Sequence, residues 1–322
     1  MNRITLIIPA YNEARNLPKL AEALRPLMSN DLTACDYDWE VLMVNDGSRD
    51  DTLGAMRELH DADSRFQYVS LSRNFGKENA LLAGLDYSTG DAAVIMDADL
   101  QHPVDAIPPM IQRWEEGYDD VYGKRLSRGR ESFLRRGLTK AFYYLLKKST
   151  HIDVLPNVGD FRLLDRKCVD ALREMRETQR YSKGLFSWIG FRKTEVQFET
   201  ADRTEGKSSF GYLSLFNLAV EGITSFTTAP LRFASVMGLI TAACALVYLV
   251  YVFVRTLLYG DPVSGYPTIM CVMLFLGGCQ LIALGIIGEY ISRIFVESKR
   301  RPPYLVECFS GEKPKAGTQR EN

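Results

Sequence analysis

The sequence lacks three features that would each restrict its function. It has no excess of charge of either sign, because 39 Lys and Arg face 40 Asp and Glu for a net charge of -1, so it lacks the broad basic surface of nucleic-acid-binding proteins and we expect no nucleic-acid partner. Its six cysteines show no C-x-x-C spacing, which argues against a zinc site and against a disulfide framework. It opens without the basic lead and long apolar run of a cleavable signal peptide, so we expect the N-terminal part to stay in the cytoplasm.

Long uncharged runs are present near the C-terminus, although the mean hydropathy is only -0.11. Residues 233–254 and 262–288 contain no Asp, Glu, Lys or Arg, and each exceeds the roughly 20 residues that a helix needs to cross a bilayer. Two such runs in succession predict a membrane hairpin rather than two buried core helices. We expect transmembrane helices over 232–258 and 267–291, joined by a short periplasmic link over 259–266.

The charges beside these runs predict their orientation. Arg232 precedes the first run and the basic triplet Lys299–Arg301 follows the second, whereas the link carries no basic residue. Basic residues concentrate on the cytoplasmic side of membrane helices, so we expect both termini in the cytoplasm. The mostly apolar stretch 211–231 predicts an amphipathic helix at the interface, and 292–322 a polar cytoplasmic tail, disordered from about Ser310.

The first two-thirds of the chain alternates short apolar runs with amphipathic ones. The expected strands are Ile4–Pro9, Trp39–Asp46, Phe66–Leu71 and Ala92–Met96, and helices are expected near 17–28, 51–60 and 77–87. This alternation is typical of an α/β domain with a parallel sheet and right-handed crossovers. We place that domain at residues 1–210 and expect ligands beyond the carboxyl ends of its strands.

The fourth expected strand ends in a pair of acids, Asp97 and Asp99. Residues two apart on an extended chain point to the same side, so their carboxylates can share one hard cation such as Mg²⁺ or Mn²⁺, and this cation can hold a diphosphate. A solvated acidic turn is the alternative interpretation of D-x-D.

Several strand-end phrases become specific when they are taken together. They are Pro9–Glu13, Asn45–Ser48, Asn74–Glu78, Asp97–Gln101, Asn157–Leu163, Leu185–Gly190, Phe275–Gly278 and Gly288–Ile291. With these phrases the chain resembles the family 2 glycosyltransferases, whose GT-A domain is a Rossmann-like nucleotide-diphospho-sugar transferase fold. The resemblance covers about residues 3–210. With its C-terminal two-helix transmembrane hairpin the chain looks like the polyprenyl-phosphate glycosyltransferases, which include bactoprenol glucosyltransferases and dolichol-phosphate mannose synthases.

This resemblance implies an enzyme, a hexosyltransferase that moves a single sugar with inversion from a nucleotide sugar to undecaprenyl phosphate. UDP-glucose is the first choice of donor, and the product would serve modification of O-antigen or teichoic acid in the cell envelope. The expected place is the bacterial cytoplasmic (inner) membrane, where a multi-pass protein meets membrane lipids and has its catalytic domain in the cytoplasm. A homo-oligomer, a tetramer, is also implied by the family.

Three alternatives stay open at this point. Another donor (UDP-GlcNAc, UDP-galactose, a UDP-aminoarabinose type or GDP-mannose) would leave the reaction unchanged. A processive polysaccharide synthase characteristically carries Q-x-x-R-W, which Gln179-Arg180-Tyr181 does not match. A non-catalytic nucleotide-sugar sensor would need neither a metal pair nor a basic cluster on the acceptor side.

The resemblance also implies roles by position. Donor binding falls to Pro9, Tyr11, Glu13, Asp46, Lys77, Asp97, Ala98, Asp99, Arg125, Arg203 and Lys207. Within this set Asp46 would accept a hydrogen bond from the uracil edge, and Arg203 and Lys207 lie in a stretch that resembles the family's mobile loop over the diphosphate. The metal ligands would be Asp97, Asp99 and Gln101, and a metal together with Arg or Lys neutralises the charge of a leaving diphosphate without a proton.

The acceptor phosphate is expected to meet Arg128, Arg135, Arg136 and Arg162. Plain attraction to anionic headgroups is the alternative for the first three. The catalytic residues would be Asp160 and Asp99, with Asp160 as base or as organiser of the acceptor. Because the second pKa of a phosphate is about 6, the acceptor is already largely ionised and a strong base is less necessary.

Overall fold

The computed structural model describes residues 2–33, 35–126, 158–178, 180–199, 229–259 and 265–311. The chain forms two compact units. One comprises residues 1–147, 151–210 and 302–322, and the other comprises 148–150 and 211–301. The C-terminal tail therefore belongs to the same unit as the N-terminal α/β region, although the whole of the second unit separates them in sequence.

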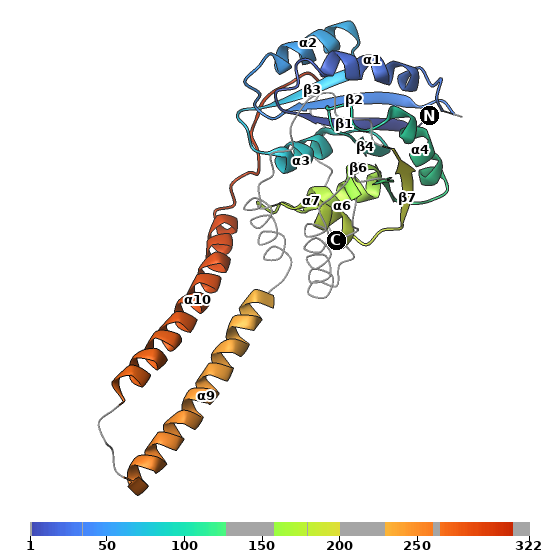
Figure 1. The fold of residues 1–322 in the computed structure, drawn as a ribbon. Coiled ribbons are helices and arrows are strands. Elements are labelled where there is room, and N and C mark those ends of the chain that lie inside the picture. The colour runs from blue at the N-terminus through green and yellow to red at the C-terminus, as the bar shows by residue number, and fades with distance from the viewer. Residues whose placement is uncertain are drawn as a thin grey trace, which may run out of the picture. The chain divides into compact units, whose positions relative to one another are not determined.

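The first unit is built on an eight-stranded sheet with the order β7-β5-β6-β4-β1-β2-β3-β8 (Figure 1). Its strands are β1 Arg3–Ala10, β2 Asp38–Asn45, β3 Phe66–Leu71, β4 Ala92–Ile95, β5 Asp120–Arg125, β6 Val158–Asp165, β7 Lys193–Phe198 and β8 Val306–Phe309. The four strands expected from the sequence pair in parallel at the centre, in the order β4-β1-β2-β3. The predicted GT-A-like α/β sheet is confirmed, with β6 and β8 as antiparallel additions on either side of the parallel centre.

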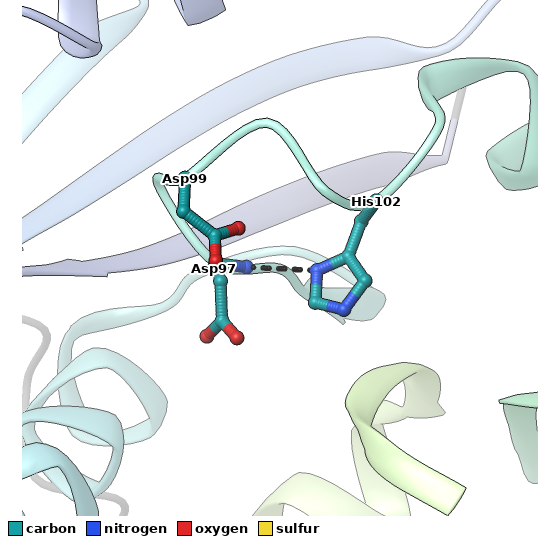
Figure 2. Close-up of side chains that lie close together, drawn as sticks. All are labelled: Asp97, Asp99 and His102. Atoms are coloured by element: carbon teal, nitrogen blue, oxygen red, sulfur yellow. Dashed lines mark hydrogen bonds between the residues drawn. The ribbon is translucent and has the colours of Figure 1, made fainter. Parts of the chain in front are cut away.

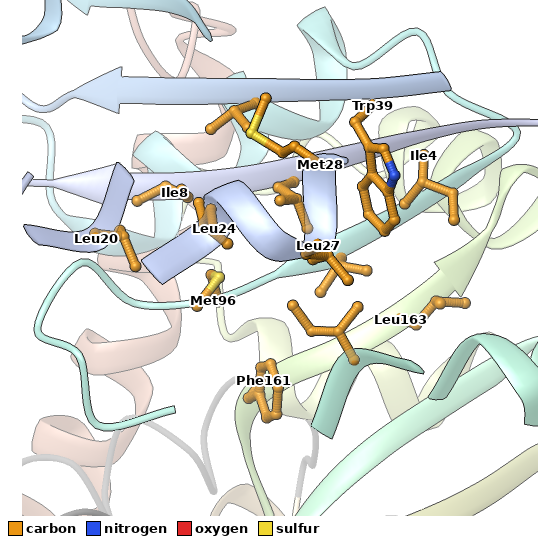
Figure 3. Packing of buried hydrophobic residues seen from close by; sticks show 14 of the residues in the cluster. Ile4, Ile8, Leu20, Leu24, Leu27, Met28, Trp39, Met96, Phe161 and Leu163 are labelled. Atoms are coloured by element: carbon orange, nitrogen blue, oxygen red, sulfur yellow. The ribbon is translucent and has the colours of Figure 1, made fainter. Parts of the chain in front are cut away.

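Helices cover both faces of this sheet. They are α1 Leu17–Met28, α2 Thr52–Ala62, α3 Lys77–Tyr87, the short 3-10 helix η1 Val104–Ala106, α4 Ile107–Glu115, α6 Arg166–Glu174 and α7 Ser182–Trp188. Alternate residues of a strand point to opposite faces. Val41 and Met43 of β2 accordingly pack in one cluster with α1 and α4, part of which Figure 3 shows, whereas Leu42 and Val44 pack with α3 on the other face.

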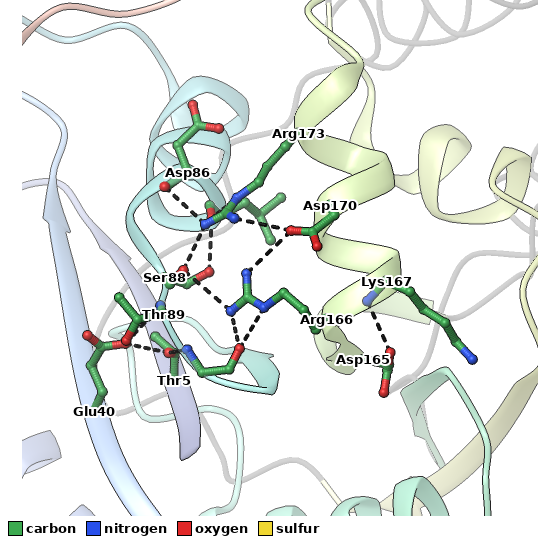
Figure 4. Close-up of polar contacts among 12 residues, drawn as sticks. Thr5, Glu40, Asp86, Ser88, Thr89, Asp165, Arg166, Lys167, Asp170 and Arg173 are labelled. Atoms are coloured by element: carbon green, nitrogen blue, oxygen red, sulfur yellow. Dashed lines mark hydrogen bonds and ion pairs between the residues drawn. The ribbon is translucent and has the colours of Figure 1, made fainter. Parts of the chain in front are cut away.

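Arginines of α6 hold the carboxyl end of α3. Arg173 donates to the carbonyls of Leu85 (2.7 Å) and Ser88 (2.7 Å), and Arg166 donates to the carbonyl of Gly90 (2.7 Å) (Figure 4). Cations at this end of a helix satisfy its free carbonyls and complement its dipole. The opposite end of α3, which begins at Lys77, is thereby held in place relative to the sheet.

The second unit contains two long helices, α9 Ala229–Tyr259 and α10 Tyr266–Ser298, which pack against each other. Within the described residues one stretch, Phe275–Ser298, is long and apolar enough to cross a membrane, and Ala234–Tyr248 forms a shorter apolar stretch. The helices extend beyond the expected spans of 232–258 and 267–291. The interfacial helix expected at 211–231 lies mostly outside the described residues, which resume at residue 229.

The tail contains a strand that the sequence analysis did not predict, just before the expected start of disorder at about Ser310. Residues 306–309 form β8, which pairs antiparallel with the edge strand β3. The alternation in Val306-Glu-Cys-Phe309 is a strand pattern, but four residues of it are too few to stand out against a polar, proline-bearing context. Order therefore continues to Gly311 within the described chain.

Candidate functional site

The loops that follow β1 and β2 bind each other at the carboxyl edge of the sheet. The backbone N–H of Asn12 donates to Ser48 Oγ (3.0 Å), and the N–H of Glu13 donates to Thr52 Oγ1 (2.9 Å). These contacts leave the Tyr11 side chain 40% exposed at the strand end, while Pro9 is buried. Burial raises the pKa of Glu13, and the negative charges of Asp99 and Asp97 raise it further, so Glu13 lies near the acidic pair.

Asp46 joins the loop after β2 to the loop after β3. Its two carboxylate oxygens accept the backbone N–H groups of Phe75 (2.7 Å) and Gly76 (3.0 Å), and the residue is only 3% exposed. Gly47 has φ +62°, and a Cβ there would lie 2.2 Å from the backbone carbon of Arg73, so this close approach needs glycine. Asp46 thus fixes the two residues that immediately precede Lys77.

Lys77 is the first residue of α3 and connects two carboxylates. Its Nζ lies 2.6 Å from Asp97 Oδ1 at the end of β4 and 2.9 Å from Asp160 Oδ2 on β6. Burial disfavours the ammonium, but the two carboxylates outweigh burial and raise the pKa of Lys77. The structure therefore brings together Lys77, Asp97 and Asp160, of which the first and the last are 83 residues apart in sequence.

Asp160 stays ionised in this cluster. Burial alone would raise its pKa, but the positive charges of Lys77 and Lys183 lower it below the usual value. Its second oxygen, Oδ1, is buried without a hydrogen-bond partner among the described residues. A buried carboxylate oxygen without a partner is costly, so among the described residues Oδ1 is an acceptor with capacity for a further hydrogen bond.

Asp97 and Asp99 lie close to a histidine, His102. Ligand atoms of Asp97, Asp99 and His102 all lie within 4.8 Å of one another (Figure 2). His102 is 4% exposed, and its ring stacks on Phe161 with ring centroids 4.7 Å apart. Gln101, the expected third ligand, contributes its backbone N–H to Asp99 Oδ1 at 3.1 Å.

Of these three side chains, the two carboxylates of Asp97 and Asp99 are suited to bind a hard divalent cation. His102 Nδ1 accepts the backbone N–H of Asp97 at 3.2 Å, so a neutral ring carries its proton on Nε2 and has no free lone pair for a metal. Asp97 and Asp99 offer oxygen ligands of the kind that Mg²⁺ and Mn²⁺ prefer. We therefore interpret His102 as the residue that orients the turn between the two acids.

Arg162, which the resemblance assigns to the acceptor phosphate, lies in a buried ion pair. It is 4% exposed, its guanidinium lies 3.1 Å from Asp120 Oδ2, and it stacks over the Phe186 ring at 3.7 Å. This buried ion pair ties β6 to β5.

The remaining expected residues fall into two groups. Ala98 is buried next to the acids, and Arg125 ends β5 close enough to His102 that its charge adds to the effect of burial in lowering the pKa of that histidine. The others lie outside the described residues: Arg128, Arg135, Arg136, Arg203 and Lys207.

The sequence analysis missed two residues beside the site, His102 and Glu78. Glu78 Oε2 accepts the backbone N–H of Ser182 at 2.9 Å and so places the start of α7 beside α3. The spacing D-x-D-x-x-H is visible in the sequence for His102. Glu78 stands in Asn74–Glu78, a phrase already singled out, but its partner lies 104 residues away.

Comparison with known proteins identifies two segments. Residues 5–173 match the family described as Glycosyl transferase family 2, and residues 229–294 match the GtrB C-terminal hairpin. The first match covers most of the eight-stranded unit, and the second covers most of α9 and α10.

Curated relatives match nearly the whole chain. Glycosyltransferase CsbB of Bacillus subtilis (strain 168) is 44% identical over 304 residues, which is 94% of this chain and 91% of the relative. The bactoprenol glucosyl transferase of Shigella phage SfV is 40% identical over 305 residues, 95% of this chain and 98% of the relative. The prophage bactoprenol glucosyl transferase homolog of Escherichia coli (strain K12) is 39% identical with the same coverage of 95% and 98%.

Solved structures are more distant. The mannosyltransferase PcManGT from Pyrobaculum calidifontis, in complex with GDP-Man and Mn²⁺, is 17% identical, with 88% of this chain and 87% of that chain covered and a TM-score of 0.43. The glucosyl-3-phosphoglycerate synthase from Mycobacterium tuberculosis, in complex with Mn²⁺, UDP-Glc and phosphoglyceric acid, is 22% identical, with 69% and 80% covered and a TM-score of 0.43.

Proposed function

The chain belongs to glycosyl transferase family 2 and carries the GtrB C-terminal hairpin, and from this premise we propose that it transfers one glucose from UDP-glucose to a polyprenyl phosphate. The choice of glucose and of the lipid acceptor is supported by relatives named bactoprenol glucosyl transferase, which are about 40% identical over nearly the whole chain. Undecaprenyl phosphate is the proposed acceptor, and the proposed product is a lipid phosphate sugar for cell-envelope glycan modification.

The observation that carries the proposal is the cluster around Lys77. One ammonium contacts a carboxylate of the acidic pair (Asp97, 2.6 Å) and the carboxylate of Asp160 (2.9 Å), whose other oxygen is buried without a hydrogen-bond partner in the described part of the chain. A transferase needs a donor side and an acceptor side within reach of one anomeric carbon. We assign Asp97 and Asp99 to the donor side and Asp160 to the acceptor side.

The proposed reaction is one displacement. A phosphate oxygen of the acceptor forms the new bond to the anomeric carbon while the bond to UDP breaks, and the bonding electrons leave with the diphosphate, so an α-linked donor gives a β-linked product. A divalent cation held by Asp97 and Asp99 would supply positive charge for that diphosphate. Burial alone would lower the pKa of Lys77, but Asp97 and Asp160 raise it by more. Lys77 therefore stays charged and adds positive charge beside the leaving diphosphate.

Asp160 is proposed as an organiser more than as a base. The acceptor phosphate is already largely ionised at neutral pH, since its second pKa is about 6. Asp160 is also ionised, because Lys77 and Lys183 outweigh its burial and lower its pKa. Its buried Oδ1 is suited to accept a hydrogen bond from a sugar hydroxyl or from an acceptor that still carries its proton.

Further assignments follow the family resemblance. Pro9, Tyr11, Glu13, Ala98 and Arg125 are proposed to contact the donor. Arg203 and Lys207 are proposed to close over the diphosphate, and Arg128, Arg135 and Arg136 to meet the lipid phosphate. Asp46 is proposed to set the donor loop through its two backbone hydrogen bonds.

The hairpin family and the apolar stretch of α10 support membrane association. We propose that α9 and α10 both span the bacterial inner membrane, with the two termini and the eight-stranded unit in the cytoplasm. Cytoplasmic placement brings the site to the side where nucleotide sugars are made. A homotetramer is proposed from the family resemblance.

The test is a transfer assay in detergent with undecaprenyl phosphate and a panel of radiolabelled donors: UDP-glucose, UDP-GlcNAc, UDP-galactose, UDP-aminoarabinose and GDP-mannose. We expect one sugar per lipid and the highest kcat/KM with UDP-glucose. A preference for another donor would replace glucose, and chains of several sugars would indicate a processive synthase. Donor binding without turnover would indicate a sensor.

A further inference from the structure

The tail that follows α10 returns to the sheet and becomes its edge strand. In the register of the β3–β8 pair, Val69 faces Phe309 and Ser70 faces Cys308. The pairing continues past the strand, because the N–H of Ser72 donates to the carbonyl of Leu305 at 2.9 Å. Ser72 opens the loop that leads to Lys77, so the tail contacts the chain immediately before the site.

Side chains of the tail pack beneath α3. Tyr304, Val306 and Phe309 contact the cluster that contains Ala80, Ala83 and Tyr87 of that helix. The Phe309 ring meets the Tyr87 ring edge-on with centroids 4.8 Å apart. This contact area is apolar on both sides, and its burial favours a docked tail.

A polar contact fixes the docked position. Tyr304 Oη donates to Asp86 Oδ2 at 2.5 Å, and Arg176 donates to both oxygens of the same carboxylate at 2.5 and 2.8 Å. Asp86, whose backbone Figure 4 shows beside Arg173, belongs to α3. The tail therefore holds α3 from its carboxyl half, while Lys77 stands at its first position.

A second path runs from the tail to the loop after β2. Ser70 Oγ lies 3.4 Å from Glu307 Oε2 and accepts a hydrogen bond from Asn45 Nδ2 at 3.0 Å. Asn45 Oδ1 in turn accepts the N–H of Ser48 at 3.0 Å, and Ser48 holds the loop after β1. Two independent sets of contacts thus join the tail to the loops that the proposed donor would occupy.

We propose that residues 302–311 are a positioning strand for the donor site: they set the loop 72–76 and α3 so that Lys77 stands between Asp97 and Asp160. The tail touches neither of these carboxylates, so it acts through β3 and α3. The inference rests on the proposed function, since it concerns the binding of that reaction's donor. On this proposal β8, the strand that follows the hairpin, both pairs with the edge strand β3 and positions residues of the site.

The main test uses two truncations of the full chain in detergent, one ending at Arg301 and a control ending at Gly311. Calorimetry with UDP and Mn²⁺ should show UDP binding at least about tenfold weaker for the first and unchanged for the second, a difference of about 1.4 kcal/mol. A synthetic peptide of residues 302–311 should restore binding to the shorter chain, because an edge strand can be supplied by a separate peptide.

Point variants cover the case in which the shorter chain does not fold. Tyr304→Phe removes the hydroxyl that contacts Asp86 and keeps the ring, whereas Leu305→Ala alters a side chain that is 54% exposed. We expect Tyr304→Phe to raise the donor KM about threefold with little change in lipid KM, and Leu305→Ala to change neither. Equal UDP affinity in all variants, with only a lower melting temperature, would overturn the inference. If the intact protein itself bound no UDP, the proposed function would fail instead.

Discussion

Lys77 Nζ contacts Asp97 at 2.6 Å and Asp160 at 2.9 Å, so one ammonium joins the metal-binding side of the site to the side assigned to the acceptor. The three residues come from three different elements: Lys77 from α3, Asp97 from the turn after β4, and Asp160 from β6. Because Asp46 holds the two residues before Lys77, the position of this ammonium depends on the loop after β2 as well.

The first prediction concerns the metal. Because Asp97 and Asp99 supply the carboxylates, EDTA should stop turnover and Mg²⁺ or Mn²⁺ should restore it. Asp97→Asn/Asp99→Asn should lose Mn²⁺ binding measured by electron paramagnetic resonance, whereas Asp105→Asn, which alters an exposed acid in η1, should keep it. Full activity and unchanged Mn²⁺ affinity in the double variant would refute the metal site.

His102 gives a sharper version of this test. If its Nδ1 keeps the hydrogen bond from the backbone of Asp97, then His102→Asn, which retains an acceptor near that position, should bind Mn²⁺ within about threefold of the parent. The melting temperature should still fall, because the variant loses the ring that stacks on Phe161. A loss of Mn²⁺ affinity greater than about tenfold would make His102 a ligand.

The second prediction concerns pH. Asp160 has a lowered pKa because Lys77 and Lys183 together outweigh its burial. In Lys77→Met one of the two positive charges that offset the burial of Asp160 is gone. The pKa of Asp160 should therefore rise, and its carboxylate should become protonated at a higher pH. The acid limb of kcat should therefore move to higher pH, with a lower plateau, while Lys77→Arg should stay close to the parent. An acid limb at the same pH in Lys77→Met would show that Asp160 does not control it.

The third prediction concerns Asp46. An asparagine there keeps one acceptor oxygen but directs an NH₂ group at a backbone N–H, so one of two buried hydrogen bonds is lost. We expect Asp46→Asn to lower the free energy of unfolding by about 1–3 kcal/mol and to raise the donor KM. Thermal unfolding and UDP calorimetry measure the two effects. Asp51→Asn, an exposed acid at the start of α2 whose side chain makes no cap hydrogen bond, is the matched control. Weaker UDP binding without any loss of stability would favour direct contact with the nucleoside.

Local patterns were sufficient to predict the centre of the sheet, and long-range contacts account for what they missed. β1 to β4 are mostly apolar runs with a helix after each of the first three, so their type and parallel pairing follow from the sequence. Asp97 and Asp99 follow the predicted strand β4, so periodicity predicts their position, whereas Asp160 lies within β6, a strand that the sequence analysis did not predict. The antiparallel β8 depends on a partner more than 200 residues earlier in the chain.

Arg162 and Lys77 show the same limit for single residues. The sequence does not reveal that Arg162 is buried, because its environment is decided by Asp120, 42 residues earlier, and by the ring of Phe186. Lys77 is expected from the resemblance to contact the donor, and the two carboxylates that hold it lie 20 and 83 residues further along the chain. Neither pairing has a local signature, because both arise where separate elements meet.

The last prediction separates the two phosphates of the proposed reaction. If Arg135 and Arg136 meet the lipid phosphate, Arg135→Ala/Arg136→Ala should raise the KM for undecaprenyl phosphate and leave UDP binding unchanged, since the donor diphosphate is assigned to other cations. Truncation of a buried charged partner costs about 2–5 kcal/mol, but less at a wet interface, so a partial loss is expected. Initial rates against each substrate in turn, with UDP calorimetry, measure this. Arg15→Ala/Lys19→Ala, two exposed cations near the start of α1, is the matched control for a general loss of positive charge. An unchanged lipid KM would mean that Arg135 and Arg136 only attract headgroups, and weaker UDP binding would place them on the donor side.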